Sequence, residues 1–382
     1  MRHRGESRFG RMNTHEFLKA IPKVSLHVHL MGSIQARTVV ELAAKHGVKL
    51  PDFNEPEDLY QYPDIYKFLH MYDNSALAIQ GRDDFARIAY ETLSEAAAHN
   101  VRYREMSFNP TTHMAVGATY QTCVDGLIDG INAARNDHGI ECRLIAAVNR
   151  MESPELAVSM VQTLLENPRE EVIGIGMDYA EAEFPPERFW KAYRMAEQAG
   201  LRLTAHQSED APPRNIETCL DLLGCERVDH GYHVVESEAI MRRVRDEGVV
   251  FTCTPVSTAW VYFGEDLSNH PIRTMKEFGI KLMIDYDDPP MFQTDPTKDY
   301  IVCAEHMGFS TEDFRNCMLN GISWTSPRSG PCDASSLRSS TRSLRSSARD
   351  APTPDGAAAP GTSTVHRQTR SDPTGRCRRR HQ

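Results

Sequence analysis

Three carboxylates end an apolar run in the segment Leu282-Met-Ile-Asp-Tyr-Asp-Asp-Pro-Pro290. The adjacent side chains of Asp287 and Asp288 repel each other unless a cation or a proton lies between one of them and another group. Histidines stand at the ends of other short apolar runs, namely His27, His29, His206 and His230. Imidazole and carboxylate groups together suit a divalent metal of intermediate softness, with zinc as the first choice. The sequence therefore indicates a chain that holds one metal ion.

Such a site would carry out hydrolysis. A zinc ion bound by three neutral imidazoles and one carboxylate keeps one position for water, whose pKa falls from ~15.7 to about 7. The reaction also needs a base for the water and an acid for the reacting nitrogen. We expect His230 to be the base or an electrostatic anchor. Glu209, three residues past His206, is the expected acid if a closed pocket raises its pKa.

His27 and His29 share one face of a predicted strand, because residues 24–30 alternate with period 2. A lone interior histidine is usually a hydrogen-bonded core residue. Two histidines at positions i and i+2, followed at once by Met31 and Gly32, make metal binding an equally good explanation.

Strands and helices alternate along the rest of the chain. Beyond the first strand, we expect strands at 101–108, 143–148, 172–177, 202–205, 227–229, 249–254 and 281–284, each followed by a helix. Eight strand–helix units fit a closed (β/α)8 TIM barrel better than a doubly wound sheet. The aromatic-rich stretch 52–72, which is either packed structure or a lid, and a long helix at 81–99 form a helical excursion after the first strand. The polar residues named above all stand at carboxyl ends of strands, where a barrel assembles its active site.

Four motifs together resemble a known family. They are Pro22-Lys-Val-Ser-Leu-His27-Val-His29-Leu-Met-Gly32, Thr204-Ala-His206-Gln-Ser-Glu209, Asp229-His230-Gly231-Tyr232-His233 and Asp287-Asp288-Pro289-Pro290-Met-Phe292. Their order and spacing resemble those of the adenosine and adenine deaminases, zinc-dependent members of the amidohydrolase barrels, over about residues 14–320. The other type of zinc deaminase is not similar, because its H-x-E and P-C-x-x-C site is absent from this sequence.

The resemblance implies a zinc-dependent aminohydrolase that removes the 6-amino group of an adenine-type purine. It assigns one zinc ion to His27, His29, His206 and Asp287. It further implies that Glu209 protonates purine N1, that His230 positions and deprotonates the attacking water, and that Asp288 holds purine N7. Adenosine is the first expectation for the substrate, and free adenine or a 5'-modified adenosine is the alternative. From another class, a purine-binding barrel without turnover is a further alternative.

The resemblance also directs attention to the substrate contacts. A contact with purine N3 is expected from the segment that contains Gly176 and Glu181, and the animal members of the family have glycine where Glu181 falls. Met31 replaces an acidic residue that binds the ribose 5'-hydroxyl in nucleoside deaminases, so the 5' position is expected to be less polar or the sugar to be held differently. Gln207 and Ser208 replace small residues, which would alter the turn that aims Glu209. Tyr286 replaces a small hydroxyl residue and would narrow the pocket.

The composition limits the remaining choices. The chain has 382 residues, of which 40% are hydrophobic and 25% charged, as in soluble globular proteins. No apolar run approaches the ~18 residues of a membrane span, so we expect a cytoplasmic protein without a membrane partner. The nine cysteines contain no C-x-x-C pair and are expected to be reduced thiols.

Three segments are expected along the chain: a disordered leader at 1–12, a deaminase barrel at 13–324 and a disordered basic tail at 325–382. The tail contains eleven Arg and four Asp but no Lys, Glu, Ile, Phe, Tyr, Asn or Met. This abrupt change of composition favours a shifted reading frame. A basic arm for nucleic acid is the weaker alternative.

Overall fold

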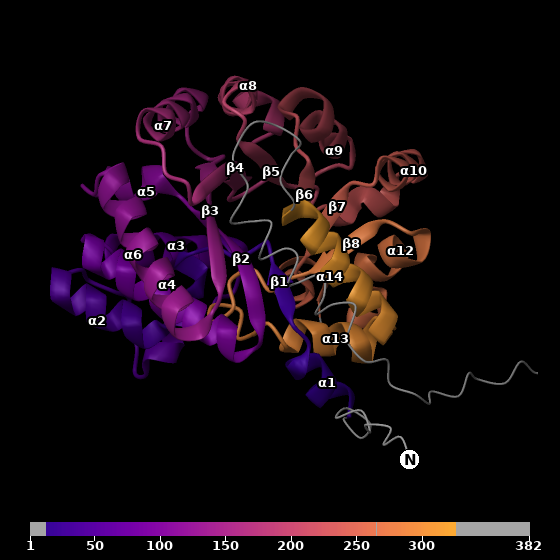
Figure 1. The fold of residues 1–382 in the computed structure, drawn as a ribbon, viewed down its shortest axis with the longest axis horizontal. Helices are drawn as coiled ribbons and strands as arrows, with labels where there is room; N and C mark the ends of the chain where they lie inside the picture. The colour runs from indigo at the N-terminus through magenta and orange to yellow at the C-terminus, as the bar shows by residue number, and fades with distance from the viewer. Residues whose placement is uncertain (1–12, 265, 326–382) are drawn as a thin grey trace, which may run out of the picture.

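The computed structural model describes residues 13–264 and 266–325 (Figure 1). The leader expected at 1–12 lies outside these residues, as does the expected tail apart from Thr325. Within the described ranges, no helix combines the length and the apolar character that a membrane crossing requires.

Eight parallel strands form a TIM barrel, and each strand pairs with the next along the chain. The strands are β1 (Lys23–Ser25), β2 (Val101–Phe108), β3 (Glu141–Asn149), β4 (Val172–Asp178), β5 (Arg202–Gln207), β6 (Arg227–His230), β7 (Val250–Cys253) and β8 (Lys281–Ile284). The helices surround this wall (Figure 1). The predicted (β/α)8 barrel is therefore confirmed.

The barrel closes through the residues that follow β1 and β8. Val28 and Asp287 form a parallel bridge, in which the His29 amide donates to the Asp287 carbonyl at 3.2 Å and the Asp287 amide donates to the His27 carbonyl at 3.2 Å. The predicted first strand thus ends early as a regular strand, but its continuation still reaches the rim. Three of the four expected metal ligands lie on this seam.

The helical excursion after the first strand is confirmed. It consists of η1 (Met31–Ser33), α2 (Ala36–His46), η2 (Pro56–Tyr60), α3 (Ile65–Leu77) and α4 (Arg82–Ala98). The helix α4 packs closely on α6 (Tyr120–His138). The two helices can approach because Gly126 and Gly130 have no side chains, and a Cβ atom at either position would collide with the backbone of α4.

The remaining helices connect and cover the strands. They are α1 (Thr14–Ala20), α5 (Pro110–Ala115), α7 (Pro154–Glu166), η3 (Pro186–Phe189), α8 (Trp190–Gln198), α9 (Arg214–Thr218), η4 (Cys219–Leu223), η5 (Tyr232–Glu236), α10 (Glu238–Glu247), α11 (Pro255–Thr258), η6 (Ala259–Phe263), η7 (Leu267–Asn269), α12 (Pro271–Phe278), α13 (Lys298–His306) and α14 (Thr311–Thr325). The last of these, α14, packs against β8 and β1.

A buried polar network inside the barrel links α14 to the site. The indole of Trp324 donates to both carboxylate oxygens of Glu105 at 3.0 Å, and Arg227 donates to Glu105 at 2.7 Å and to Asp229 at 3.0 Å. Asp229 in turn accepts a hydrogen bond from Thr252 at 2.6 Å. Because these charges are buried, each needs the partners that the network provides. The network supports the strand ends from inside the barrel.

Candidate metal centre and catalytic pocket

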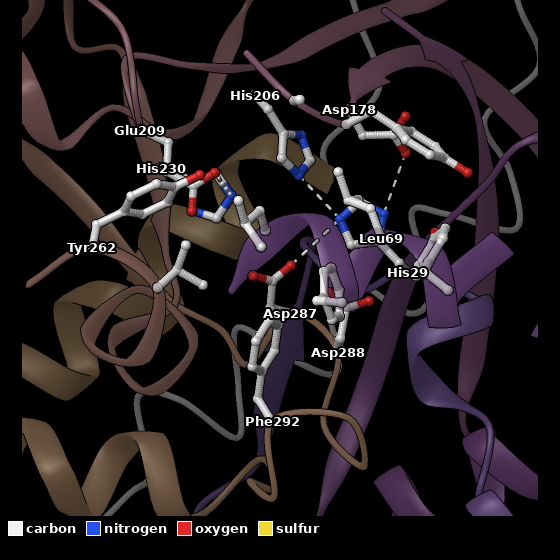
Figure 2. Close-up of a pocket in the computed structure, with 16 residues that line it drawn as sticks. His29, Leu69, Asp178, His206, Glu209, His230, Tyr262, Asp287, Asp288 and Phe292 are labelled. Carbon is white, nitrogen blue, oxygen red and sulfur yellow. Dashed lines mark hydrogen bonds and ion pairs between the residues drawn. The ribbon is translucent and has the colours of Figure 1, made fainter. Parts of the chain in front are cut away.

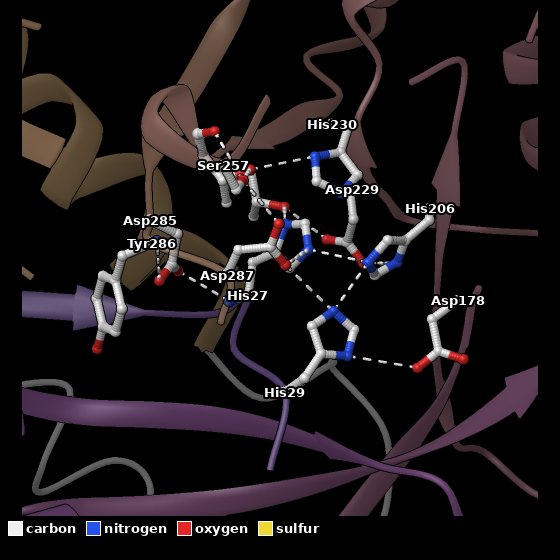
Figure 3. Close-up of polar contacts among 12 residues, drawn as sticks. His27, His29, Asp178, His206, Asp229, His230, Ser257, Asp285, Tyr286 and Asp287 are labelled. Atoms are coloured by element: carbon white, nitrogen blue, oxygen red, sulfur yellow. Dashed lines mark hydrogen bonds and ion pairs between the residues drawn. The ribbon is translucent and has the colours of Figure 1, made fainter. Parts of the chain in front are cut away.

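Four side chains converge at the carboxyl ends of the strands (Figure 3). The Nε2 atoms of His27 and His29 each lie 3.0 Å from Nε2 of His206. Oδ1 of Asp287 lies 3.5 Å from Nε2 of His27 and 3.4 Å from Nε2 of His29. Among the described residues, these four alone form a group whose ligand atoms all lie within 4.8 Å of one another. The structure thus brings together the predicted ligand set.

The donor set fits a divalent cation. Ligands about 2.0–2.1 Å from a tetrahedral zinc ion are roughly 3.3 Å apart, which matches the observed separations. A neutral imidazole has a single N–H donor, so an imidazole whose Nδ1–H donates outward presents only a lone pair at Nε2. Such lone pairs and a carboxylate oxygen pointing at a common centre cannot form hydrogen bonds with one another. A cation at this centre accounts for the arrangement.

The imidazoles are oriented from outside by oxygen atoms. Nδ1 of His27 lies 3.0 Å from Oγ1 of Thr252, and Nδ1 of His29 lies 3.4 Å from Oδ2 of Asp178. Nδ1 of His206 lies 3.9 Å from Oδ2 of Asp229, which is beyond hydrogen-bond distance, so this carboxylate acts on His206 only through its charge. A partner at Nδ1 favours the tautomer whose Nε2 lone pair faces inward. The second oxygen of Asp287 accepts a hydrogen bond from Ser257 at 2.8 Å.

A pocket opens beside this centre (Figure 2). Its lining consists of His29, Ile65, Phe68, Leu69, Tyr72, Asp178, Tyr179, Ala180, His206, Glu209, His230, Val261, Tyr262, Asp287, Asp288 and Phe292. The inner end carries the imidazoles and carboxylates of the strand ends. The helices α3 and η6 contribute mostly apolar side chains. The excursion therefore supplies part of the pocket wall, as a lid would.

Glu209 and His230 face each other in the pocket, with Oε2 of Glu209 3.5 Å from Nε2 of His230. Burial, reinforced by the nearby carboxylates of Asp287 and Glu181, raises the pKa of Glu209 well above its usual range. Burial, followed by the neighbouring imidazole of His27, lowers the pKa of His230 to about 3. The raised pKa favours the protonated form of Glu209, and the lowered pKa favours the neutral form of His230.

Three residues that line the pocket have left-handed backbones. His230 has φ +67°, Asp287 has φ +59° and Tyr179 has φ +70°. This conformation costs a non-glycine residue about 1–3 kcal/mol, and such strain is concentrated at functional sites.

Asp288 is buried beside Gly32. Its Oδ1 atom has no hydrogen-bond partner among the described residues. Burial, together with the charge of Asp287, raises the pKa of Asp288 well above its usual range. A protonated Asp288 can donate a hydrogen bond to a ligand nitrogen in the pocket.

Four residues differ from their expected placement. Met31, Gly176 and Glu181 do not line the pocket, although the resemblance assigned them to the substrate. Met31 is fully buried in the hydrophobic core, Gly176 lies within β4 against Ile145, and the carboxylate of Glu181 binds backbone amides. Tyr286 does not narrow the pocket, because its hydroxyl is turned to Arg104 at 2.6 Å. Local sequence did not reveal these side-chain directions.

Sequence reasoning missed several residues that hold the site. Thr254 lies 3.3 Å from Nδ1 of His230, and Ser257 donates to both Thr254 and Asp287. Asn109 donates to both oxygens of Asp178, at 2.8 and 3.0 Å. The available signal was polar side chains just after the predicted strands at 101–108 and 249–254.

Comparison with known proteins gives a consistent set of similarities. The family model described as adenosine deaminase matches residues 22–328. The chain is 33% identical to an adenine deaminase of Rhodospirillum rubrum over 315 residues, which cover 81% of this chain and 94% of that protein. It is also 33% identical to an adenine deaminase of Streptomyces coelicolor over 311 residues, covering 81% of this chain and 91% of that protein.

Three solved structures have a fold similar to that of this chain. An amidohydrolase from Burkholderia ambifaria with bound zinc superposes with a TM-score of 0.80 at 34% identity, covering 90% of this chain and 97% of that chain. The adenine deaminase from Arthrobacter aurescens gives a TM-score of 0.78 at 29% identity, covering 86% and 99%. An N6-methyl-AMP deaminase from Arabidopsis thaliana, at 20% identity and a TM-score of 0.74, shares the fold.

Proposed function

This chain belongs to the adenosine deaminase family of hydrolytic deaminases, and on that basis we propose that it converts free adenine and water into hypoxanthine and ammonia. Adenosine, the first expectation from the sequence, has less support than its alternative. The relatives at 33% identity are adenine deaminases.

The apolar outer wall of the pocket is the observation that favours free adenine over adenosine as the substrate. Ile65, Phe68, Leu69, Val261 and Phe292 are apolar. The hydroxyls of the neighbouring Tyr72 and Tyr179 are bonded to Asn109 and Asp73, respectively. Tyr262 apart, these side chains offer the hydroxyl groups of a bound ribose few hydrogen bonds in exchange for the water that they would lose. A planar purine without a sugar avoids that cost.

The metal-binding residues in this proposal are His27, His29, His206 and Asp287, and we propose zinc as the ion. The Burkholderia neighbour has zinc bound, and three imidazoles with one carboxylate suit this metal. When bound, the ion supplies a water whose pKa is lowered to about 7. The surrounding oxygens of Thr252, Asp178, Asp229 and Ser257 hold the ligands in position.

In this proposal, Glu209 and His230 transfer protons, and Asp288 donates a hydrogen bond. Protonated Glu209 donates to purine N1, which makes C6 more electrophilic. His230 accepts a proton as the oxygen of water forms its bond to C6, and Asp288 donates a hydrogen bond to N7. The proton on His230 then passes to the 6-amino nitrogen, the C6–N bond breaks, and ammonia leaves. The C6 hydroxyl gives its proton back to Glu209 as the C6=O bond forms, and N1 keeps the proton that it received. The product is hypoxanthine.

An ammonia-release assay with the full chain tests the substrate. The panel is adenine, adenosine, 5'-deoxyadenosine and AMP, each with bound metal measured in parallel. We expect kcat/KM for adenine to exceed that for adenosine by about 100-fold or more. A higher value for adenosine would refute the choice of the base. No release from any purine by metal-loaded protein would favour the alternative of a purine-binding barrel without turnover.

A further inference from the structure

Glu181 lies in the loop after β4 and receives four hydrogen bonds from the turn after β5. Its Oε1 atom accepts from the side-chain amide of Gln207 and from the backbone amide of Ser208 at 2.6 Å. Its Oε2 atom accepts from the backbone amides of Glu209 at 2.9 Å and Asp210 at 3.1 Å. Glu181 is only 4% exposed, so water does not replace it in these contacts. One buried carboxylate thus binds three successive backbone amides.

The turn depends on such an acceptor because its backbone is strained. Ser208 has φ +54°, in the left-handed region. Its carbonyl accepts from the backbone amide of His233 at 2.9 Å, and its hydroxyl donates to the carbonyl of Pro212 at 3.0 Å. Because the carbonyl and the hydroxyl of Ser208 are both hydrogen-bonded, the direction in which the Glu209 side chain leaves the turn is fixed.

Gln207 has its amide orientation set by a third group. Arg150 donates to the side-chain oxygen of Gln207 at 3.3 Å and to the carbonyl of His206 at 2.9 Å. The Gln207 nitrogen therefore faces Glu181. Glu181 and Gln207, which lie 26 positions apart in the sequence, are thus direct partners.

We propose that Glu181 is a positioning residue for deamination, which holds the turn at 207–210 so that Glu209 faces N1 of the purine. Glu181 does not line the pocket, whereas Glu209 does and lies 3.5 Å from His230. Glu181 therefore acts through Glu209. This inference rests on the proposed role of Glu209 as the proton donor.

Glu181→Gln is the decisive variant. It keeps the size of the side chain, but its amide group must face two N–H donors of the turn in either orientation. Glu181→Asp keeps both oxygens on a shorter side chain, and Glu183→Gln removes an exposed carboxylate from the same loop. For each full-length variant, kcat, KM, bound metal and hydrogen exchange of the amides at 208–210 are measured.

We expect Glu181→Gln to lower kcat by about 10- to 100-fold, since small misplacements of a catalytic group have effects of this size. KM and bound metal should stay as in the wild type, and exchange at 208–210 should accelerate. Glu181→Asp should recover part of the lost kcat, and Glu183→Gln should match the wild type.

A wild-type kcat in Glu181→Gln would overturn the proposal. A fall in kcat that parallels a loss of metal would also overturn it, because Glu181 would then act through His206. If the wild type released ammonia from no purine, the proposed function would be refuted independently of the role of Glu181. Hydrogen exchange would still decide the positioning role, since unchanged protection at 208–210 in Glu181→Gln would exclude it.

Discussion

Nδ1 of His29 lies 3.4 Å from Oδ2 of Asp178, although His29 follows β1 and Asp178 is the last residue of β4. Asp178 itself accepts two hydrogen bonds from the side-chain amide of Asn109, and Asn109 accepts one from the hydroxyl of Tyr72 at 3.3 Å. This chain of contacts fixes which nitrogen of His29 faces the metal centre. It joins β2, β4 and the helical excursion around a single imidazole.

Asp178→Asn should weaken metal binding. The substitution keeps the shape of the side chain but removes the charge that orients His29, and loss of such outer partners lowers metal affinity by about 10- to 100-fold. Competition with a chelator measures the change. Asp83→Asn, which alters an exposed carboxylate at the start of α4, serves as the control. Equal affinity in Asp178→Asn and the wild type would contradict the orienting role.

Glu209→Gln should abolish most activity while the metal content stays unchanged. Removal of a general acid lowers kcat by about 10²- to 10⁴-fold. In the wild type, activity should fall as pH rises through the raised pKa of Glu209, because only its protonated form donates. The alkaline limb of the kcat/KM profile measures this. Retained activity in Glu209→Gln would remove Glu209 from the role of proton donor.

Gly32→Ala should displace Asp288. An added Cβ would occupy the position of the Asp288 carboxylate. We expect kcat/KM to fall by about 10- to 100-fold through misplacement of a substrate contact, while the metal stays bound. Gly81→Ala is the control, because the nearest atom to its added Cβ lies at 3.5 Å. An unchanged kcat/KM in Gly32→Ala would argue against a contact between Asp288 and the purine.

The stability of the fold should depend on pH through His113. Burial lowers the pKa of His113 to about 4, and its ring packs edge-on against Phe85. In the unfolded chain, a histidine takes up a proton near pH 6.5, whereas the folded chain resists protonation until about pH 4. The unfolded state therefore binds more protons between these values, and stability falls as the pH decreases through this range. From pH 7.5 to 5.0, the loss due to His113 is about 2 kcal/mol.

Urea unfolding of the wild type and of His113→Met at both pH values tests this expectation. His113→Met keeps a buried side chain of similar size without a titrating group. Its free energy of unfolding should change less with pH than that of the wild type. His306→Met, at a site with a half-exposed side chain, should keep the wild-type pH dependence. If the free energy of unfolding of His113→Met changed with pH as much as that of the wild type, His113 would not be the source of the change.

Trp324→Phe should destabilise the barrel. The indole donates to both oxygens of Glu105 and lies over the guanidinium groups of Arg202 at 3.9 Å and Arg227 at 4.6 Å. Phenylalanine keeps a ring but leaves a buried carboxylate without this donor, which costs about 1–3 kcal/mol. Denaturant unfolding measures the loss. Trp190→Phe, where the tryptophan is 45% exposed, should have a smaller effect, and equal effects would contradict the argument.

The (β/α)8 barrel and a metal site at one of its rims could be predicted from residue types and their spacing. These features rest on local signals: the period of apolar residues, the alternation of strands with helices, and histidines and carboxylates at strand ends. Such signals survive in a single sequence, because parallel strands in a barrel bring their carboxyl ends to one rim. The choice of His27, His29, His206 and Asp287 among the polar residues of that rim came from the resemblance to the deaminase family, and the structure brings these four together.

The partners of each of these groups could be identified only from the folded chain. Glu181 and Tyr286 looked like pocket residues, but one binds the turn at 207–210 and the other binds Arg104. The links from Ser257 to Asp287 and from Asp178 to His29 join separate strands. The pKa of Glu209 likewise depends on burial by segments far away in the chain. Side-chain direction, burial and pairing are set by packing between distant elements, so residue types and spacing alone did not contain them.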